Sequence, residues 1–266
     1  MLTNFHTHTT FSDGKNTPEE VVLTALEQGF CSIGFSDHAY TPYDTSYCMK
    51  NEQSYIKEIR RLQEKYKKEI EIYLGVEEDS HFLVNRENFD YIIGSCHYAK
   101  KGEKYCAIDS NVDSFLDCLA FFNNDEMAFA EYYFQHFCDY ILKRKPDIIG
   151  HFDLITKFEE KGEGRYLKNS RYLDLAEKYC LEALKSGSIF EINTGLVTRG
   201  YRSSFCPHER LLYLIYKNGG KITISSDSHE IKTLQGCFDE AKAMLKEIGF
   251  QYVYLLKNGE WTKNYI

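Results

Sequence analysis

Long apolar runs and targeting signals are missing from this sequence of 266 residues. A membrane-spanning helix needs about 18 consecutive apolar residues, and no stretch of the chain reaches that length. The opening residues Met1 to His6 lack the basic and apolar regions of a secretory signal peptide. These absences exclude membrane insertion and predict a cytoplasmic protein.

Paired cysteines and an excess of basic residues are also missing. The chain has nine cysteines, an odd number, and no two of them have C-x-x-C spacing. We therefore exclude a disulfide framework and expect buried thiols. The net charge of −8 excludes a nucleic-acid backbone as the main partner, because no excess of lysine and arginine is present. A small anionic partner then requires a local source of positive charge.

Three common catalytic motifs are absent as well. The sequence contains no G-x-x-x-x-G-K-[ST] phosphate loop, no G-x-G-x-x-G after a strand and no G-x-S-x-G turn. A kinase, a dinucleotide-dependent enzyme and a serine hydrolase therefore lack support.

The hydrophobic pattern predicts an α/β protein in which short strands alternate with amphipathic helices. The predicted strands are Leu2–His6, Ser32–Ser36, Glu71–Glu77, Tyr91–Cys96, Asp147–Gly150, Ser188–Asn193 and Lys221–Ser226. The first predicted helix begins directly after Thr17. The others span Glu52–Lys68, Met127–Lys143, Ser170–Ser186, Pro207–Asn218 and Gly236–Ile248. Tyr252–Leu256 is either an eighth strand or a separate edge piece. The pattern favours one barrel domain over residues 1–266.

Residue types that bind metals lie at or just after the ends of most predicted strands. In a parallel barrel these ends share one face, where the connecting loops build the active site. The candidate ligands are His6, His8, Asp13, His38, Glu77, His97, His151, Asp227 and His229. Their number exceeds what one tetrahedral ion needs, so we expect two or three ions bridged by carboxylate.

The ligand types narrow the choice of metal. Imidazole and carboxylate together suit Zn, Mn or Fe, whereas an all-oxygen set would suit Mg or Ca. The remaining histidines are read as structural residues; they are His81, His136 and His208. Asp37 and Asp153 adjoin candidate ligands, and we expect each to accept a hydrogen bond from an imidazole or to cap a loop.

The motifs that contain these residues resemble those of the PHP (polymerase and histidinol phosphatase) metallohydrolases. They are His6-Thr7-His8, Ser12-Asp13-Gly14, Ser36-Asp37-His38, Gly75-Val76-Glu77, Gly94-Ser95-Cys96-His97, Gly150-His151-Phe152-Asp153 and Ser226-Asp227-Ser228-His229. They occur in the family's order and span the chain. The segment Glu191-Ile192-Asn193-Thr194-Gly195 is most similar to the stand-alone histidinol-phosphate phosphatases of histidine biosynthesis.

The resemblance implies a distorted (β/α)7 barrel with three divalent metal ions. It assigns His6, His8, Glu77 and Asp227 to one ion. Glu77 bridges to a second ion, held by His97 and His151, and the third is held by Asp13, His38 and His229. The implied activity is hydrolysis of L-histidinol phosphate, by metal-hydroxide attack without a covalent intermediate.

The charge of such a cluster suits a phosphorylated metabolite as substrate. Three divalent ions outweigh three carboxylates, so the cluster attracts an anion. An arginine fork could bind the phosphoryl oxygens, and the candidates are Arg199, Arg165 and Arg202. Asp13 or His229 is the candidate general acid for the leaving alcohol.

Other interpretations remain open at this point. The same ligands would serve a phosphodiesterase or nucleotidase, since they do not encode the leaving group. A non-catalytic metal-binding module is disfavoured because structural zinc sites are usually closed by four, mostly cysteine, ligands. The aromatic-rich stretch Phe115–Tyr140 fits core packing, a substrate lid or the face of a homo-oligomer.

Overall fold

Seven parallel strands form the central sheet of the protein. The computed structural model describes residues 1–162 and 164–266. The strand order is β1-β2-β3-β4-β7-β8-β9, and all neighbouring pairs are parallel. The strands are β1 (Thr3–Asn4), β2 (Ser32–Phe35), β3 (Glu71–Asp79), β4 (Tyr91–Ser95), β7 (Ile148–Ile149), β8 (Ile189–Asn193) and β9 (Lys221–Ser225). All seven predicted strands are confirmed.

The first and last strands of the sheet meet just beyond their carboxyl ends. A parallel bridge joins Thr7 to Ser228. The His8 amide donates to the Ser228 carbonyl at 2.8 Å, and the Ser228 amide donates to the His6 carbonyl at 3.2 Å. These bonds nearly close the sheet into a cylinder, which confirms the expected distorted (β/α)7 barrel.

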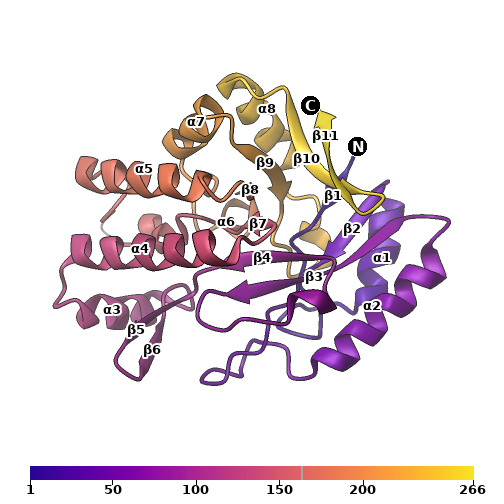
Figure 1. Cartoon of the computed structure of the whole chain (residues 1–266), viewed down its shortest axis with the longest axis horizontal. Coiled ribbons are helices and arrows are strands. Elements are labelled where there is room, and N and C mark those ends of the chain that lie inside the picture. The colour runs from indigo at the N-terminus through magenta and orange to yellow at the C-terminus, as the bar shows by residue number, and fades with distance from the viewer. Residues whose placement is uncertain (163) are drawn as a thin grey trace.

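Helices cover the outside of the barrel, as Figure 1 shows. They are α1 (Pro18–Glu27), α2 (Glu52–Tyr66), α3 (Val112–Phe121), α4 (Glu126–Arg144), α5 (Ser170–Leu184), α6 (Gly195–Thr198), α7 (Glu209–Lys217) and α8 (Phe238–Ile248). The start of α1 follows from its sequence, because Thr17 and Glu20 form a capping box and Pro18 occupies the first turn. Short 3-10 helices lie at Arg86–Asn88, Leu154–Thr156, Glu159–Lys161 and Ile231–Thr233.

Two antiparallel hairpins lie outside the barrel sheet. One pairs β5 (Tyr98–Lys101) with β6 (Lys104–Ala107), and the sequence pattern did not predict it. The other pairs β10 (Tyr252–Lys257) with β11 (Glu260–Tyr265), so the final apolar run is a separate edge piece. This second hairpin lies beside the N-terminus in Figure 1, where Trp261 packs edge-on against Phe5 at 5.4 Å.

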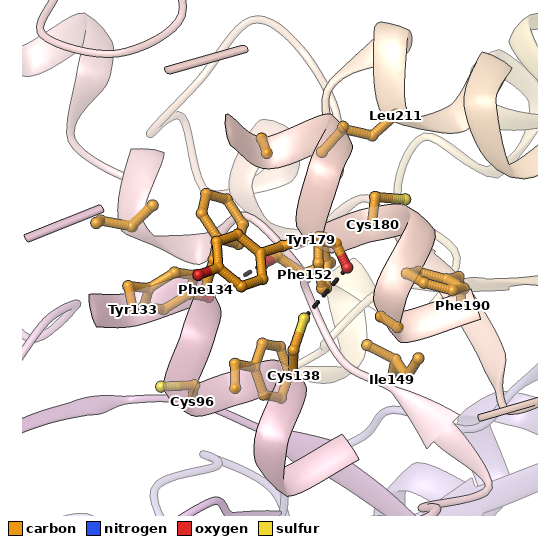
Figure 2. Packing of buried hydrophobic residues seen from close by; sticks show 14 of the residues in the cluster. Cys96, Tyr133, Phe134, Cys138, Ile149, Phe152, Tyr179, Cys180, Phe190 and Leu211 are labelled. Atoms are coloured by element: carbon orange, nitrogen blue, oxygen red, sulfur yellow. Dashed lines mark hydrogen bonds between the residues drawn. The ribbon is translucent and has the colours of Figure 1, made fainter. Parts of the chain in front are cut away.

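The aromatic-rich stretch is part of the largest core cluster. Phe129, Tyr133, Phe134 and Phe137 on α4 are fully buried. Figure 2 shows Phe134 beside Tyr179 and Phe152, with ring centroids of the first pair 6.0 Å apart. The helix face is therefore core, and it is not a lid.

The cysteines bear out the expectation of buried thiols only in part. All nine are unpaired, and six are buried, among them Cys96, Cys138 and Cys180 of Figure 2. The Cys138 thiol donates to the Tyr179 carbonyl at 3.2 Å. Cys31 is exposed, so the prediction of a buried thiol is wrong at that position. In the described part of the chain, no helix has the length and apolarity required to cross a bilayer.

The largest cluster should dominate stability. Leu212 on α7 is fully buried in it, so Leu212→Ala should lower the free energy of unfolding by about 2–5 kcal/mol through lost burial and a cavity. Leu83, 58% exposed, gives the matched control, and Leu83→Ala should change stability by less than about 0.5 kcal/mol. Denaturant unfolding measures both, and equal effects would contradict the assigned core.

Candidate metal centre

Six strands of the barrel deliver the nine candidate ligands to one end of the sheet. His6, His8 and Asp13 follow β1, and His38 follows β2. Glu77 lies inside β3, and His97 and His151 follow β4 and β7, respectively. Asp227 and His229 follow β9. Because these strands are parallel, their carboxyl ends lie at the same end of the barrel.

The structure brings all nine side chains into four overlapping groups. Within each group, one possible ligand atom per residue lies within 4.8 Å of the others. The groups are His8, Asp13, His38 and His229; His6, Glu77 and His151; His6, His8 and Asp227; and His38, Glu77 and His97. Shared members make this a single cluster that can hold more than one ion. The groups differ in part from the partition that the resemblance implies, since His38 lies with Glu77 and His97.

Unpartnered buried atoms show that the cluster fits metal ions. Polar atoms inside proteins nearly always have a hydrogen-bond partner. Among the described residues, buried ligand atoms without one are His6 Nε2, His8 Nδ1 and Nε2, Glu77 Oε2, His97 Nδ1 and His151 Nδ1. Nitrogen and carboxylate oxygen are the donors that zinc, manganese and iron accept.

Glu77 has the geometry of a bridging carboxylate. Its Oε1 lies 2.9 Å from His151 Nε2 and 3.3 Å from His97 Nε2, whereas its Oε2 lies 2.9 Å from His38 Nδ1. Burial would raise the pKa of Glu77, but neighbouring imidazoles, led by His6 and His38, hold it well below its usual range. Glu77 is therefore ionised, and its two oxygens face different groups of ligands.

His8 is held in the neutral form that binds metal. Burial, together with the imidazoles of His229 and His38, lowers the pKa of His8 to about 3. Its ring stacks on His229 with a centroid distance of 4.2 Å. At neutral pH the ring is therefore uncharged, and one of its nitrogens has a lone pair available for coordination.

Asp227 is held in a backbone conformation that few residues other than glycine adopt. Its φ is 48°, in the left-handed region, where non-glycine residues are strained and often functional. Arg199 Nη2 donates to Asp227 Oδ2 at 2.8 Å, and Arg199 Nη1 donates to the Asp227 carbonyl. Burial would raise the pKa of Asp227, but Arg199 and His6 hold it well below its usual range.

The position of Asp13 depends on the close approach of the Gly14 backbone to the backbone of His8 and Thr9. A Cβ atom on Gly14 would lie 2.5 Å from the carbonyl oxygen of His8, so only glycine fits there. The resulting turn places Asp13 Oδ2 3.3 Å from His229 Nε2 and Asp13 Oδ1 3.7 Å from His38 Nε2. Asp13 and His229 are the more exposed members of the cluster.

Comparison with known proteins agrees with this geometry. The PHP domain matches residues 4–195, which is more than half of the chain. The chain belongs to the PHP domain family. It is therefore a metal-dependent phosphoesterase, as the resemblance of its motifs predicted.

Relatives of this PHP protein are similar over nearly their whole length. A Schizosaccharomyces pombe protein named "Probable histidinol-phosphatase" is 30% identical over 265 residues, which cover 91% of this chain and 84% of the relative. The histidinol-phosphatase of Lactococcus lactis is 26% identical over 281 residues, covering 98% and 96% of the two chains.

Solved structures show the same fold. A Listeria monocytogenes protein matches with a TM-score of 0.78 at 19% identity, over 90% of this chain and 99% of that one. The Lactococcus lactis histidinol phosphate phosphatase, solved with zinc, L-histidinol and phosphate, matches with a TM-score of 0.71 at 21% identity, over 98% of each chain.

Two carboxylates that the sequence reading missed support ligand imidazoles of the PHP site. Glu191 on β8 lies with one oxygen 2.9 Å from His6 Nδ1, and its other oxygen accepts from the His151 amide at 2.7 Å. Asp79 at the end of β3 accepts from the His97 amide at 2.9 Å and lies 3.5 Å from His97 Nδ1. Such partners fix the ring orientation of metal-bound histidines.

Strand periodicity was the signal that could have found both carboxylates. Asp79 lies two residues after Glu77, and Glu191 lies two residues before Asn193, so each pair shares one face of its strand. An acidic residue in a buried strand needs a polar partner.

Asp37 and Asp153 fix loops and do not hold imidazoles. Asp37 accepts from the amides of Thr9 and Ser12 at 2.8 and 3.1 Å. Asp153 accepts from the His208 amide at 2.9 Å and from the Cys206 thiol at 2.7 Å. Of the two roles expected for these residues, the structure shows loop capping.

The three candidate arginines lie in different places. Arg199 reaches the cluster through Asp227, with Nη1 also 3.3 Å from His229 Nδ1. Arg165 instead pairs with Glu126 and lines a separate apolar pocket. Arg202 is buried and donates to Thr156, Ser204 and the Phe205 carbonyl. Arg165 lies in the loop between the 3-10 helix Glu159–Lys161 and α5, and its partner Glu126 begins α4. Glu163 in this loop lies outside the described residues.

The other histidines have structural contacts. His81 and His136 stack with ring centroids 4.1 Å apart, and His208 caps α7 by accepting from the Arg210 amide at 3.3 Å. None of the three belongs to a potential metal group in the described residues.

A cavity of about 670 Å³ opens over the metal cluster. Its walls include the candidate ligands Asp13, His38 and His229 together with Arg199. They also include Lys157, a cation that the sequence reading missed, which donates to Asp109 at 3.1 Å. The space is sufficient for a small phosphorylated metabolite.

Glu191 provides a test of how the cluster is held. Burial would lower the pKa of His6, but the carboxylates of Glu191, Glu77 and Asp227 raise it well above its usual value. Glu191 also contacts His6 Nδ1 and so orients the ring. Glu191→Gln should lower zinc affinity or kcat by roughly 10- to 100-fold. Competition with a chromogenic chelator measures the affinity.

The control is Glu103→Gln, in the exposed turn of the β5–β6 hairpin, which should change neither quantity. Wild-type zinc affinity and kcat in Glu191→Gln would show that His6 is oriented without this carboxylate.

Proposed function

We propose that this PHP protein is a histidinol-phosphatase that hydrolyses L-histidinol phosphate to L-histidinol and phosphate in histidine biosynthesis. The observation that carries the proposal is the nine-ligand cluster at the base of a cavity lined by Arg199. Relatives named for this activity align over nearly the whole chain, which supports the choice of substrate. We further propose that residues 1–266 act as one domain.

The proposed cofactor is a set of three divalent ions, zinc, manganese or iron. His6, His8, Glu77 and Asp227 would hold one ion, and Glu77 would bridge to a second at His97 and His151. Asp13, His38 and His229 would hold the third. Bound ions supply Lewis acidity and activate water at neutral pH, so the reaction needs no covalent phosphoenzyme.

Arg199 is the proposed group that orients the phosphoryl oxygens. Its guanidinium is fixed by two hydrogen bonds to Asp227 and lines the cavity. A planar fork beside the ions can bind equatorial oxygens while charge develops on them. Arg199 also lowers the pKa of Asp227, so it serves both the cluster and the substrate.

Asp13 and His229 are the proposed proton source for the leaving alcohol. Burial would raise the pKa of Asp13, but His38 and His229 hold it far below its usual range. His229 Nε2 lies 3.3 Å from Asp13 Oδ2, and both side chains line the cavity. In the three-ion site both side chains would be ligands, so they would act by holding and orienting the water that gives up the proton.

A substrate comparison tests the proposed reaction. The protein reconstituted with Zn, Mn or Fe should hydrolyse L-histidinol phosphate with a higher kcat/KM than aryl phosphates, because contacts to remote groups orient the transition state. Phosphate release across monoesters, diesters and nucleotides measures this. A diester or nucleotide turned over far better than histidinol phosphate would favour a PHP phosphodiesterase or nucleotidase.

Removal of the guanidinium should weaken catalysis. Arg199→Ala, assayed at saturating metal, should lower kcat/KM for histidinol phosphate by about 2–4 kcal/mol in transition-state stabilisation. Arg210→Ala is the matched control, because Arg210 lies on the surface at 43% side-chain exposure and should keep wild-type kinetics. Unchanged kinetics in Arg199→Ala, with a loss in Arg165→Ala, would transfer the role to Arg165.

A further inference from the structure

Three acidic residues line the cavity without belonging to the candidate ligand set. They are Asp44, Asp109 and Glu230. Asp109 is paired with Lys157 at 3.1 Å, and Glu230 lies 3.0 Å from both Lys15 and Lys232. The charges of these two acids are therefore offset by neighbouring lysines.

Asp44 is the remaining acid, and no lysine or arginine in the described residues forms an ion pair with it. Its Oδ1 accepts from the amide and the hydroxyl of Ser46 at 3.0 and 2.6 Å. Its carbonyl accepts from Thr41 Oγ1 at 2.7 Å, which fixes the backbone of the loop after β2. The loop therefore presents a negative charge that no lysine or arginine of residues 1–162 and 164–266 neutralises.

Two aromatic rings also line the cavity, and one of them, Tyr47, lies on the same loop as Asp44. Tyr47 and Tyr98 have ring centroids 6.1 Å apart, and the Tyr47 ring lies edge-on to the candidate ligand His38 at 4.8 Å. Tyr43 supports them, since it packs edge-on to Tyr98 at 4.6 Å and stacks on Tyr105 at 4.2 Å. Aromatic faces and a carboxylate together are the usual receptor for an organic cation.

The charge of the metal centre makes such a receptor necessary for a zwitterionic substrate. Ions beside Arg199 attract a phosphate group but repel an ammonium or imidazolium on the same molecule. A carboxylate outside the ligand set offsets this repulsion, and among the described cavity acids only Asp44 has no basic partner.

We propose that Asp44, Tyr47 and Tyr98 form a subsite for the cationic group of a phosphomonoester whose phosphate lies at the metal centre. The inference rests on the proposed phosphomonoesterase activity and names the residues that select its substrate. Asp44 pairs with the cation, and the two tyrosine rings contact its apolar atoms. The preferred substrates are then phosphomonoesters that carry an ammonium or imidazolium.

A pair of matched substrates tests the subsite independently of histidinol phosphate. O-phosphoethanolamine and 2-hydroxyethyl phosphate differ in an ammonium and a hydroxyl. The wild-type protein should prefer the former, and Asp44→Asn should lower the ratio of the two kcat/KM values by roughly 10- to 100-fold, the scale of one charged hydrogen bond. The same ratio is measured for L-histidinol phosphate against 2-hydroxyethyl phosphate.

Glu230→Gln is the control. It also removes a carboxylate from the cavity, but the charge of Glu230 is already offset by Lys15 and Lys232. It should leave both ratios unchanged, and metal content and melting temperature confirm that each variant is intact. An unchanged ratio in Asp44→Asn, or a wild type that does not prefer the ammonium ester, would overturn the subsite. In a third outcome, the wild type prefers O-phosphoethanolamine, Asp44→Asn loses that preference, and histidinol phosphate is a poor substrate. This outcome would overturn only the choice of natural substrate.

Discussion

The rest of the structure depends on the burial of one carboxylate among imidazoles. Glu77 is 1% exposed, and its two oxygens lie within 3.5 Å of nitrogens from five histidines: His6, His8, His38, His97 and His151. An isolated buried carboxylate would cost several kcal/mol. Only the parallel barrel brings these residues, which are far apart in the chain, to one end. The same arrangement that makes the charge tolerable also creates a set of ligands for divalent ions.

Surrounding residues hold the cluster in place and shape the cavity above it. Glu191 and Asp79 support His6 and His97, and Arg199 ties Asp227 into its left-handed conformation. The cavity lining carries charges of both signs, since it includes Arg199, which lies near His229, and Asp44, which lies on the loop after His38. Such a lining suits a substrate that carries both phosphate and a cation.

Much of the fold and of the candidate site could be predicted, because the ligand residues lie close in the sequence to the strands that position them. The seven strands are short runs bounded by loops, and the ligands follow them directly, so residues such as His97 and Asp227 are visible in the sequence. The β5–β6 hairpin and α3 were not predicted. For α3 a local signal was present, because Asn111 and Ser114 form a capping box at its start. Strand periodicity places Glu191 on the face of β8 that carries the site, but it does not give its partners His6 and His151. These partners, and the distant location of Arg165, depend on which side chains meet across the barrel.

The central claim is that the clustered ligands hold ions on which phosphoester hydrolysis depends. Its most direct test is to remove metal by chelation and then titrate Zn, Mn or Fe back, with ions bound per chain measured beside phosphate release. The account predicts that activity disappears with the metal and returns only as more than one ion binds each chain. Full turnover by metal-free protein would contradict it.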